Sequence, residues 1–270
     1  MLLKASTING YAVAARDGRI GVISDLLFDD STWLVRWCVI DTGTWLSSRK
    51  VLLPPSALGH LNTDTEEFSV RLTKQEVKDS PDIDTDKPVS RQMENGIYDY
   101  FGWSPYWGTG FYMGGYGFVP PPIAESASPG CWERDDGLAS GGDPHLRSAT
   151  AVTGYHIHAR DGEIGHVEDF LVAEADWSIR YLIVDTKNWW PGKSVLVSPI
   201  LAIEIVWMDR LVELDCSRQS IKNAPTYDTS TMVDRAYERN YHDHHAKERT
   251  AHVSEPDIAA ELADQMTNRP

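Results

Sequence analysis

Histidine is the residue type in this chain that most directly suggests metal chemistry. The segment HDHHAKERTAH (242–252) contains His242, His245 and His252. On a helix, His242 and His245 share one face and His252 lies two turns further on. A zinc site usually needs three or four converging nitrogen, sulfur or oxygen ligands. One hypothesis is therefore a metal or small-ligand site on this helix; the alternative is exposed or packing histidines with no cofactor.

A carboxylate at position 41 suggests hydrolysis. Asp41 lies in VIDTGTW (39–45), and two apolar residues followed by Asp-Thr-Gly are how aspartic proteases present a catalytic carboxylate. That chemistry needs two such carboxylates sharing one proton. The related segment VDTKNW (184–189) replaces the glycine with Lys187, whose charge would keep a neighbouring Asp ionised. We therefore expect Asp41 to accept backbone N–H groups in a turn, and the chain to be non-catalytic, with a hydrolase at Asp41 as a remote alternative.

The chain contains an internal repeat, and Asp41 lies in its first copy. Residues 10–45 align without gaps on residues 154–189, which begin 144 positions later. The shared positions include the turn dipeptides Asp17-Gly18 and Asp161-Gly162, and a Trp, an Arg and an Asp in each copy. We expect Arg36 to pair with Asp25, and Arg180 with Asp169. The repeat also places His156, His158 and His166 where the first copy has Ala12, Ala14 and Val22, so these histidines could cluster or be incidental.

Each copy is predicted to form a succession of short strands. Asp-Gly is a hairpin-turn dipeptide, and the following segments alternate apolar and polar residues before proline ends a strand. Short helices follow, one beginning at a Thr73/Glu76 capping box and one at Ser217. The sequence predicts a mainly β fold with two small antiparallel β-barrels, each followed by short helices. The predicted boundaries are a first barrel with its helices (1–101), a Gly/Pro/aromatic linker (102–149), a second barrel with its helix (150–249) and a tail (250–270).

The order of these motifs resembles the PRC-barrel family. The turn Asp-Gly, an Ile-Gly, Asp-[Leu/Phe]-Leu, a Trp, then Arg-[Trp/Tyr] and a strand ending in Asp-Thr occur in both copies, so the chain resembles a tandem PRC-barrel protein. The family takes its name from the barrel of the photosynthetic reaction-centre H subunit, and its members serve as interaction modules. The resemblance implies a non-catalytic adaptor, associated with a membrane electron-transfer assembly or a stress response. The chain departs from the H subunit in having no membrane helix.

Aromatic side chains are the candidate interface residues. Trp45, Trp189 and Trp190 follow the Asp-Thr turns, and Trp103 and Trp107 lie in the linker. Aromatic residues on turns serve as interface anchors; the alternative is that they cap the ends of the barrels. The two barrels are expected to pack against each other within the chain, or to form a homodimer.

The composition of the chain limits which partners and which cellular compartment we expect. The net charge of −15 argues against a nucleic-acid surface, which needs clustered Lys and Arg, and favours a basic partner. The three cysteines are far apart, so no disulfide framework is implied. No segment has the length and apolar composition of a signal peptide or a bilayer span. We expect a cytoplasmic protein with an unidentified protein partner, no integral membrane segment, and at most peripheral membrane contact.

Overall fold

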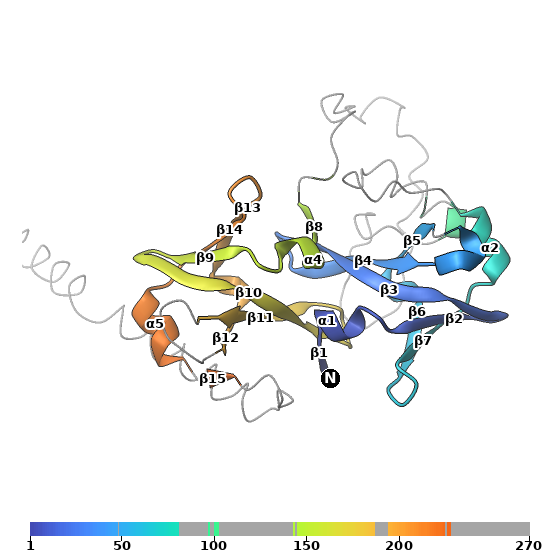
Figure 1. Cartoon of the computed structure of the whole chain (residues 1–270), viewed down its shortest axis with the longest axis horizontal. Coiled ribbons are helices and arrows are strands. Elements are labelled where there is room, and N and C mark those ends of the chain that lie inside the picture. The colour runs from blue at the N-terminus through green and yellow to red at the C-terminus, as the bar shows by residue number, and fades with distance from the viewer. Residues whose placement is uncertain are drawn as a thin grey trace, which may run out of the picture.

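The computed structural model describes residues 1–47, 49–80, 97, 100–102, 143, 145–186, 194–224 and 226–227. Two sheets lie side by side, one from each half of the chain (Figure 1). The first half contains β1 (Leu2–Lys4), α1 (Ala5–Ile8), β2 (Ala12–Ala15), β3 (Gly18–Asp29), β4 (Leu34–Asp41), η1 (Gly43–Leu46), β5 (Lys50–Leu53), η2 (Pro55–Ala57), β6 (Leu58–Asn62), β7 (Glu67–Val70) and α2 (Lys74–Asp79). The second half contains β8 (Leu146–Ser148), α4 (Ala149–Val152), β9 (His156–Ala159), β10 (Gly162–Ala173), β11 (Ile179–Asp185), β12 (Ser194–Val197), η3 (Pro199–Leu201), β13 (Ala202–Val206), β14 (Leu211–Leu214), α5 (Arg218–Asn223) and β15 (Thr226–Tyr227).

The two sheets have the same strand order. It is β5-β4-β3-β2-β7-β6 in the first and β12-β11-β10-β9-β14-β13 in the second, with β15 added beside β12. Corresponding elements also keep the spacing of the sequence repeat: β3 begins at Gly18 and β10 at Gly162. The prediction of a mainly β chain is confirmed.

The described strands do not form closed barrels of the predicted antiparallel kind, which the sequence indicates to be closed or nearly closed. Each sheet is open, because β5 does not pair with β6 and neither β12 nor β15 pairs with β13. Two pairs, β2 with β7 and β9 with β14, are parallel. The physical reason for the openings is proline: Pro55 and Pro199 begin the 3-10 turns η2 and η3. Proline has no N–H to donate, so pairing stops where these turns change the direction of the chain.

Two glycines in each half explain the repeated turn. Gly18 and Gly162 follow the turn aspartates with φ of 125° and 132°, a conformation that side chains with a Cβ rarely adopt. Gly21 lies so close to β4 that an added Cβ would come within 2.1 Å of the Asp41 carbonyl oxygen. The same contact at Gly165 would be 2.0 Å from the Asp185 carbonyl oxygen. Each Ile-Gly pair therefore allows the long strand to approach its neighbour.

The two short helices begin as their sequences predict. The Thr73 hydroxyl accepts a hydrogen bond from the backbone N–H of Glu76, and the Glu76 carboxylate accepts one from the backbone N–H of Thr73, at 2.7 Å. The hydrogen bonds that the Glu76 carboxylate accepts, first from the Thr73 backbone N–H and then from the Thr73 hydroxyl, hold the pKa of Glu76 below its ordinary value. Ser217 caps α5 in the same place, without the glutamate.

The halves exchange their first strands. β1 of the first half pairs with Leu171–Ala173, the end of β10 that β9 does not reach. In return, β8 of the second half pairs with Leu27–Asp29 of β3. Figure 1 shows β8 and α4 beside β3 at the junction. Part of each sheet therefore comes from the other half.

A single hydrophobic core spans both halves. One continuous cluster of buried side chains contains residues from β2–β7 and from β9–β14. Across the junction, the rings of Phe28 and Phe170 lie 5.6 Å apart, as do those of Phe68 and Trp177. Cys38 is fully buried in this core, and that burial raises the pKa of its thiol. Residues 146–148, assigned to the linker from the sequence, instead form a strand of this shared structure.

One aspartate in each half fastens the exchanged segment. Asp169 accepts hydrogen bonds from the backbone N–H of Ser6 at 3.2 Å and from the Ser6 hydroxyl at 2.5 Å. Asp25 accepts from the Thr150 hydroxyl at 2.8 Å and the Ser148 hydroxyl at 2.5 Å. Hydrogen bonds to an ionised carboxylate are roughly twice as strong as neutral ones. These two aspartates therefore hold the start of α1 and of α4 against the opposite sheet.

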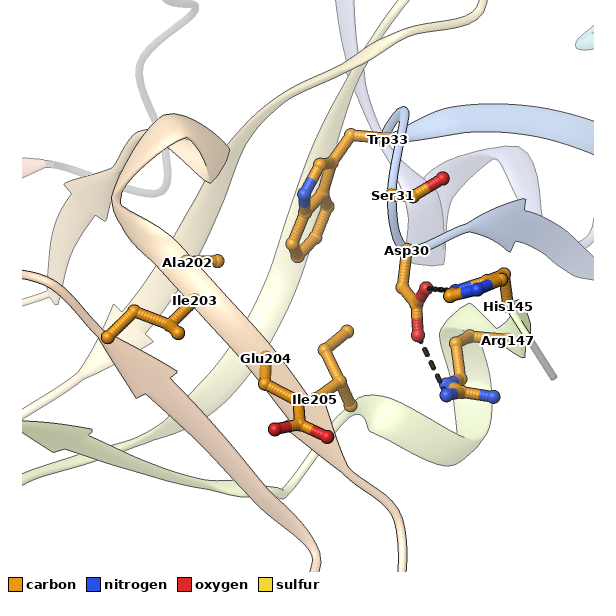
Figure 2. Close-up of a pocket in the computed structure, with 9 residues that line it drawn as sticks. All are labelled: Asp30, Ser31, Trp33, His145, Arg147, Ala202, Ile203, Glu204 and Ile205. Carbon is orange, nitrogen blue, oxygen red and sulfur yellow. Dashed lines mark hydrogen bonds and ion pairs between the residues drawn. The ribbon is translucent and has the colours of Figure 1, made fainter.

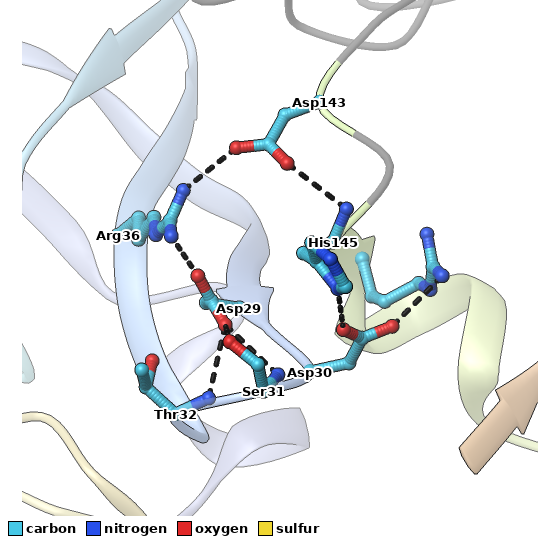
Figure 3. A network of polar contacts seen from close by, with 8 residues as sticks. Asp29, Asp30, Ser31, Thr32, Arg36, Asp143 and His145 are labelled. Atoms are coloured by element: carbon cyan, nitrogen blue, oxygen red, sulfur yellow. Dashed lines mark hydrogen bonds and ion pairs between the residues drawn. The ribbon is translucent and has the colours of Figure 1, made fainter.

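This arrangement corrects the expected arginine pairs. Arg36 forms an ion pair with Asp29 and another, at 2.8 Å, with Asp143, not with Asp25 (Figure 3). Arg180 pairs with Asp176 at 2.6 Å, not with Asp169. The aspartates predicted to bind the arginines are used instead to join the halves.

We expect Asp169→Asn and Ser6→Ala each to lower the free energy of unfolding by about 1–3 kcal/mol, because each leaves a partly or fully buried polar group without its partner. The double variant should cost less than the sum of the two, since both changes remove one interaction. Urea denaturation followed by tryptophan fluorescence measures all three. Asp209→Asn, at an exposed carboxylate, is the control and should change stability by less than about 0.5 kcal/mol. Strictly additive losses would show that the contact across the halves carries no energy.

The capping box predicts a pH dependence with a definite sign. Because the pKa of Glu76 is lowered in the folded chain, its contribution is fully present above the unfolded-state pKa and is lost as the pH falls through the folded-state pKa. An NMR titration of the Glu76 side chain should give a pKa below the ordinary glutamate value. Thr73→Ala should move this pKa only part of the way back upward, because the variant loses the hydroxyl and keeps the backbone N–H. A native Glu76 pKa at the ordinary value would contradict the assigned cause.

Candidate interaction surface

Most of the residues singled out from the sequence lie outside the described residues. These are the histidines His242, His245 and His252 and the tryptophans Trp103, Trp107, Trp189 and Trp190. Their proposed roles in metal binding or in an interface stay predictions.

Trp45 is the candidate interface residue that the structure describes. Its side chain is 37% exposed, and its indole N–H donates a hydrogen bond to the Ile20 carbonyl oxygen. The Lys74 ammonium lies 5.6 Å from the ring centroid. Trp45 is thus attached to β3 and to the start of α2, an arrangement that suits the alternative of a cap over the end of the strands. A role as an interface anchor stays a prediction.

Asp41 makes the turn contact expected of a structural carboxylate. One of its oxygens accepts a hydrogen bond from the backbone N–H of Gly43 at 2.8 Å. This is the local Asx-type bond that closes a turn after a strand.

The three histidines of the second half lie on neighbouring strands without forming a metal site. His156 is opposite His166, and His158 is opposite Glu163, in the pairing of β9 with β10. His156 is 2.9 Å from Glu163, and His166 is 3.7 Å from Asp185. Within the part of the chain that the structure describes, no group of three or more His, Cys, Asp or Glu side chains has an arrangement that could bind a metal ion.

Two adjoining hollows lie at the junction of the halves. One has a volume of about 290 Å³ and lies between the β3–β4 turn of the first half, β8, and the strand β13 (Figure 2). The other is a larger open groove of about 1120 Å³ that extends past Met1 to η3. Both are lined by residues of the same turn and of β13: Asp30, Ser31, Trp33, Ala202 and Ile203. Together they form a continuous concave surface to which both halves contribute.

Trp33 forms a fixed wall of this surface. It has a φ of 56°, and its counterpart Trp177 has 55°, values that are strained for a bulky side chain. Two backbone hydrogen bonds between the halves hold both residues in place. Ile179 donates its N–H to the Trp33 carbonyl at 2.8 Å, and Val35 donates its N–H to the Trp177 carbonyl at 2.9 Å. The Trp33 ring also stacks on Phe28 at 5.5 Å.

Another side of the small hollow is polar, and its charged groups pair with one another. The Asp30 carboxylate lies 2.8 Å from His145 Nδ1 and 2.8 Å from the Arg147 guanidinium (Figure 2). Figure 3 shows how Asp143 continues this network, accepting from the backbone N–H of His145 and from Arg36. The charged groups drawn in this wall are thus paired with one another. They hold Asp143, His145 and Arg147 beside the β3–β4 turn.

Beside the hollows the second half exposes large apolar side chains. Ile200 is 76% exposed, Ile203 62%, Trp207 52% and Met208 88%. We call these four residues, on η3 and the β13–β14 hairpin, the apolar face. Large apolar side chains exposed on a protein surface commonly mark a site of interaction where they form a patch.

The first half serves as an internal comparison for this surface. At the positions equivalent to the apolar face it carries exposed Ser56, Gly59, Thr63 and Asp64. Since β6, β7 and η2 form the same elements with those residues, the fold does not require the apolar ones. These four residues are visible in the sequence only as positions where the aligned halves differ, and they match no motif.

None of the helices in the described ranges has the length and apolar composition needed to cross a bilayer.

Comparison with known proteins places part of the chain in a family. Residues 2–76 match the PRC-barrel domain. A protein of Deinococcus radiodurans, itself described as uncharacterised, is 30% identical over 86 residues. The match spans 32% of this chain and 31% of that relative, so the chain covers about a third of its length. The match begins at the exchanged strand β1 and ends within α2, so this segment of the first half is similar to a PRC-barrel domain.

Proposed function

We propose that the chain is a non-catalytic interaction module that binds a partner protein at the apolar face and the adjoining junction groove. The observation that carries this proposal is the difference between the halves. One half has polar or small residues at four exposed positions, and the other has Ile200, Ile203, Trp207 and Met208. Exposing such side chains to water brings no stability to the fold, so a partner that covers them accounts for their presence.

We further propose that the second half is also a PRC-barrel-type domain, which makes the chain a tandem protein. The support is the shared strand order and the constant spacing of the elements. Association with a membrane electron-transfer assembly or with a stress response, as the family resemblance implies, finds no support in the described residues and does not form part of the proposal.

A binding role fits the groove better than a catalytic one. Catalysis by a carboxylate or an imidazole requires that group to reach a substrate. In the groove, Asp30 is already paired with His145 and Arg147. Glu204 is a carboxylate in the lining without an ion pair among the described residues, and it lies between the apolar Ile203 and Ile205, as in surfaces that bury a partner side chain beside a charged one.

The test replaces three of the four residues of the apolar face with the first half's own residues. We expect the variant Ile200→Ser, Trp207→Thr, Met208→Asp to unfold within about 1 kcal/mol of the native chain, because exposed positions contribute little to stability. Affinity capture from lysate of the source cells, with mass spectrometry, should then show at least one protein bound by the native chain and lost by the variant.

The matched control changes the equivalent hairpin of the first half: Ser56→Ala, Thr63→Ser and Asp64→Asn. This variant should retain the partner. An identical set of captured proteins from the native chain and from the Ile200, Trp207 and Met208 variant would overturn the proposal. So would a loss of stability large enough to show that the apolar face belongs to the core.

A further inference from the structure

Two glutamates face each other beside the apolar face. Glu204 on β13 is directly opposite Glu213 on β14 in the strand pairing, so their side chains lie on the same face of the sheet. Both side chains are exposed. Like charges directly opposite each other on adjacent strands destabilise a sheet, by roughly 0.2–1 kcal/mol. Among the described residues, neither carboxylate has an ion pair that would offset this repulsion.

The fold does not require this pair of charges. The equivalent positions in the first half are His60 and Ser69, on β6 and β7, which also pair antiparallel but with a register shift between Leu58 and Leu61. The same hairpin in the second half has therefore acquired both the apolar face and two opposed carboxylates. Two independent departures from the first half thus coincide on one surface.

Further ionisable side chains lie beside Glu213 on the neighbouring strands of the sheet. His158 is opposite Glu213 in the parallel pairing of β14 with β9, and Glu163 is opposite His158 on β10. Glu163 is bound by His156 at 2.9 Å. Arg160 is already paired with Asp215, at the end of β14. The carboxylates of Glu204 and Glu213 are the acidic groups closest to Ile203 along these strands.

We propose that this surface binds a protein segment that places a Lys or Arg side chain between Glu204 and Glu213 and apolar side chains against Ile200 and Ile203. The inference rests on the proposed function and names the chemistry of its partner. A cation between the two carboxylates replaces a repulsion with two attractions, and an Arg guanidinium can donate to both. The chain's net charge of −15 also attracts a basic partner at long range.

The same charges argue against other ligands. The phosphates of a nucleic acid or of an anionic membrane would be repelled by the opposed carboxylates and by the net negative charge. A metal ion would need at least a third ligand, and the described residues form no such group here. An apolar surface beside two carboxylates suits a peptide that carries both kinds of side chain.

The experiment uses a library of random 12-residue peptides displayed on phage and selected on the full chain. Enriched peptides should carry more Lys and Arg than the unselected library, next to aliphatic or aromatic residues. A synthetic peptide with the enriched sequence should bind the Glu204→Gln, Glu213→Gln variant about tenfold more weakly than the native chain, and its affinity should fall as salt is raised. Asp64→Asn, in the equivalent hairpin of the first half, is the control and should leave binding unchanged.

The outcomes separate this inference from the proposed function. If enriched peptides lose binding in the Ile200→Ser, Met208→Asp variant but bind the double glutamine variant normally, the basic-partner inference is overturned while the interaction surface stands. If binding is unaffected by either variant, both fail. A dimer seen by analytical ultracentrifugation that Ile200→Ser, Met208→Asp abolishes would overturn the inference by assigning the surface to a second copy of the chain.

Discussion

The structure depends on one reciprocal contact: a carboxylate in each half holds the first strand and short helix that the other half supplies. Asp169 binds Ser6, and Asp25 binds Ser148 and Thr150. Without these exchanged segments, the free end of each long strand would expose unpaired backbone groups, which are costly when buried and attract other chains when exposed. The two sheets therefore stabilise each other, and the single core that crosses the junction is a consequence.

A shared core leaves the outer surfaces free to differ. Because stability comes from strands and side chains common to both halves, exposed positions can change without loss of fold. The second half differs from the first at the exposed positions Ile200, Ile203 and Met208, and at Glu204 and Glu213. The first half has Ser56, Gly59, Asp64, His60 and Ser69 at these positions. The binding surface that we propose thus lies on exposed positions of the second half that the shared core does not constrain.

Local features were predictable from the sequence because they depend on neighbouring residues: the turn glycines, the capping box at Thr73 and the position of most strands. Long-range features were not. Strand β1 is three residues long and its partner lies far along the chain, so no local pattern could identify the exchange. Arg36 was assigned Asp25, whereas it pairs with Asp29 and also with Asp143, which is 107 residues away. The residues of the proposed binding surface follow no motif, and their exposure depends on the folded structure.

Native-state hydrogen exchange tests the central claim that the two halves are one cooperative unit. The amides of Leu27–Asp29, paired with β8, and those of Leu171–Ala173, paired with β1, should exchange only through global unfolding, with free energies that agree within about 1 kcal/mol. Exchange of one group at a free energy several kcal/mol below the other would contradict it. That result would show that one half opens while its neighbour stays folded.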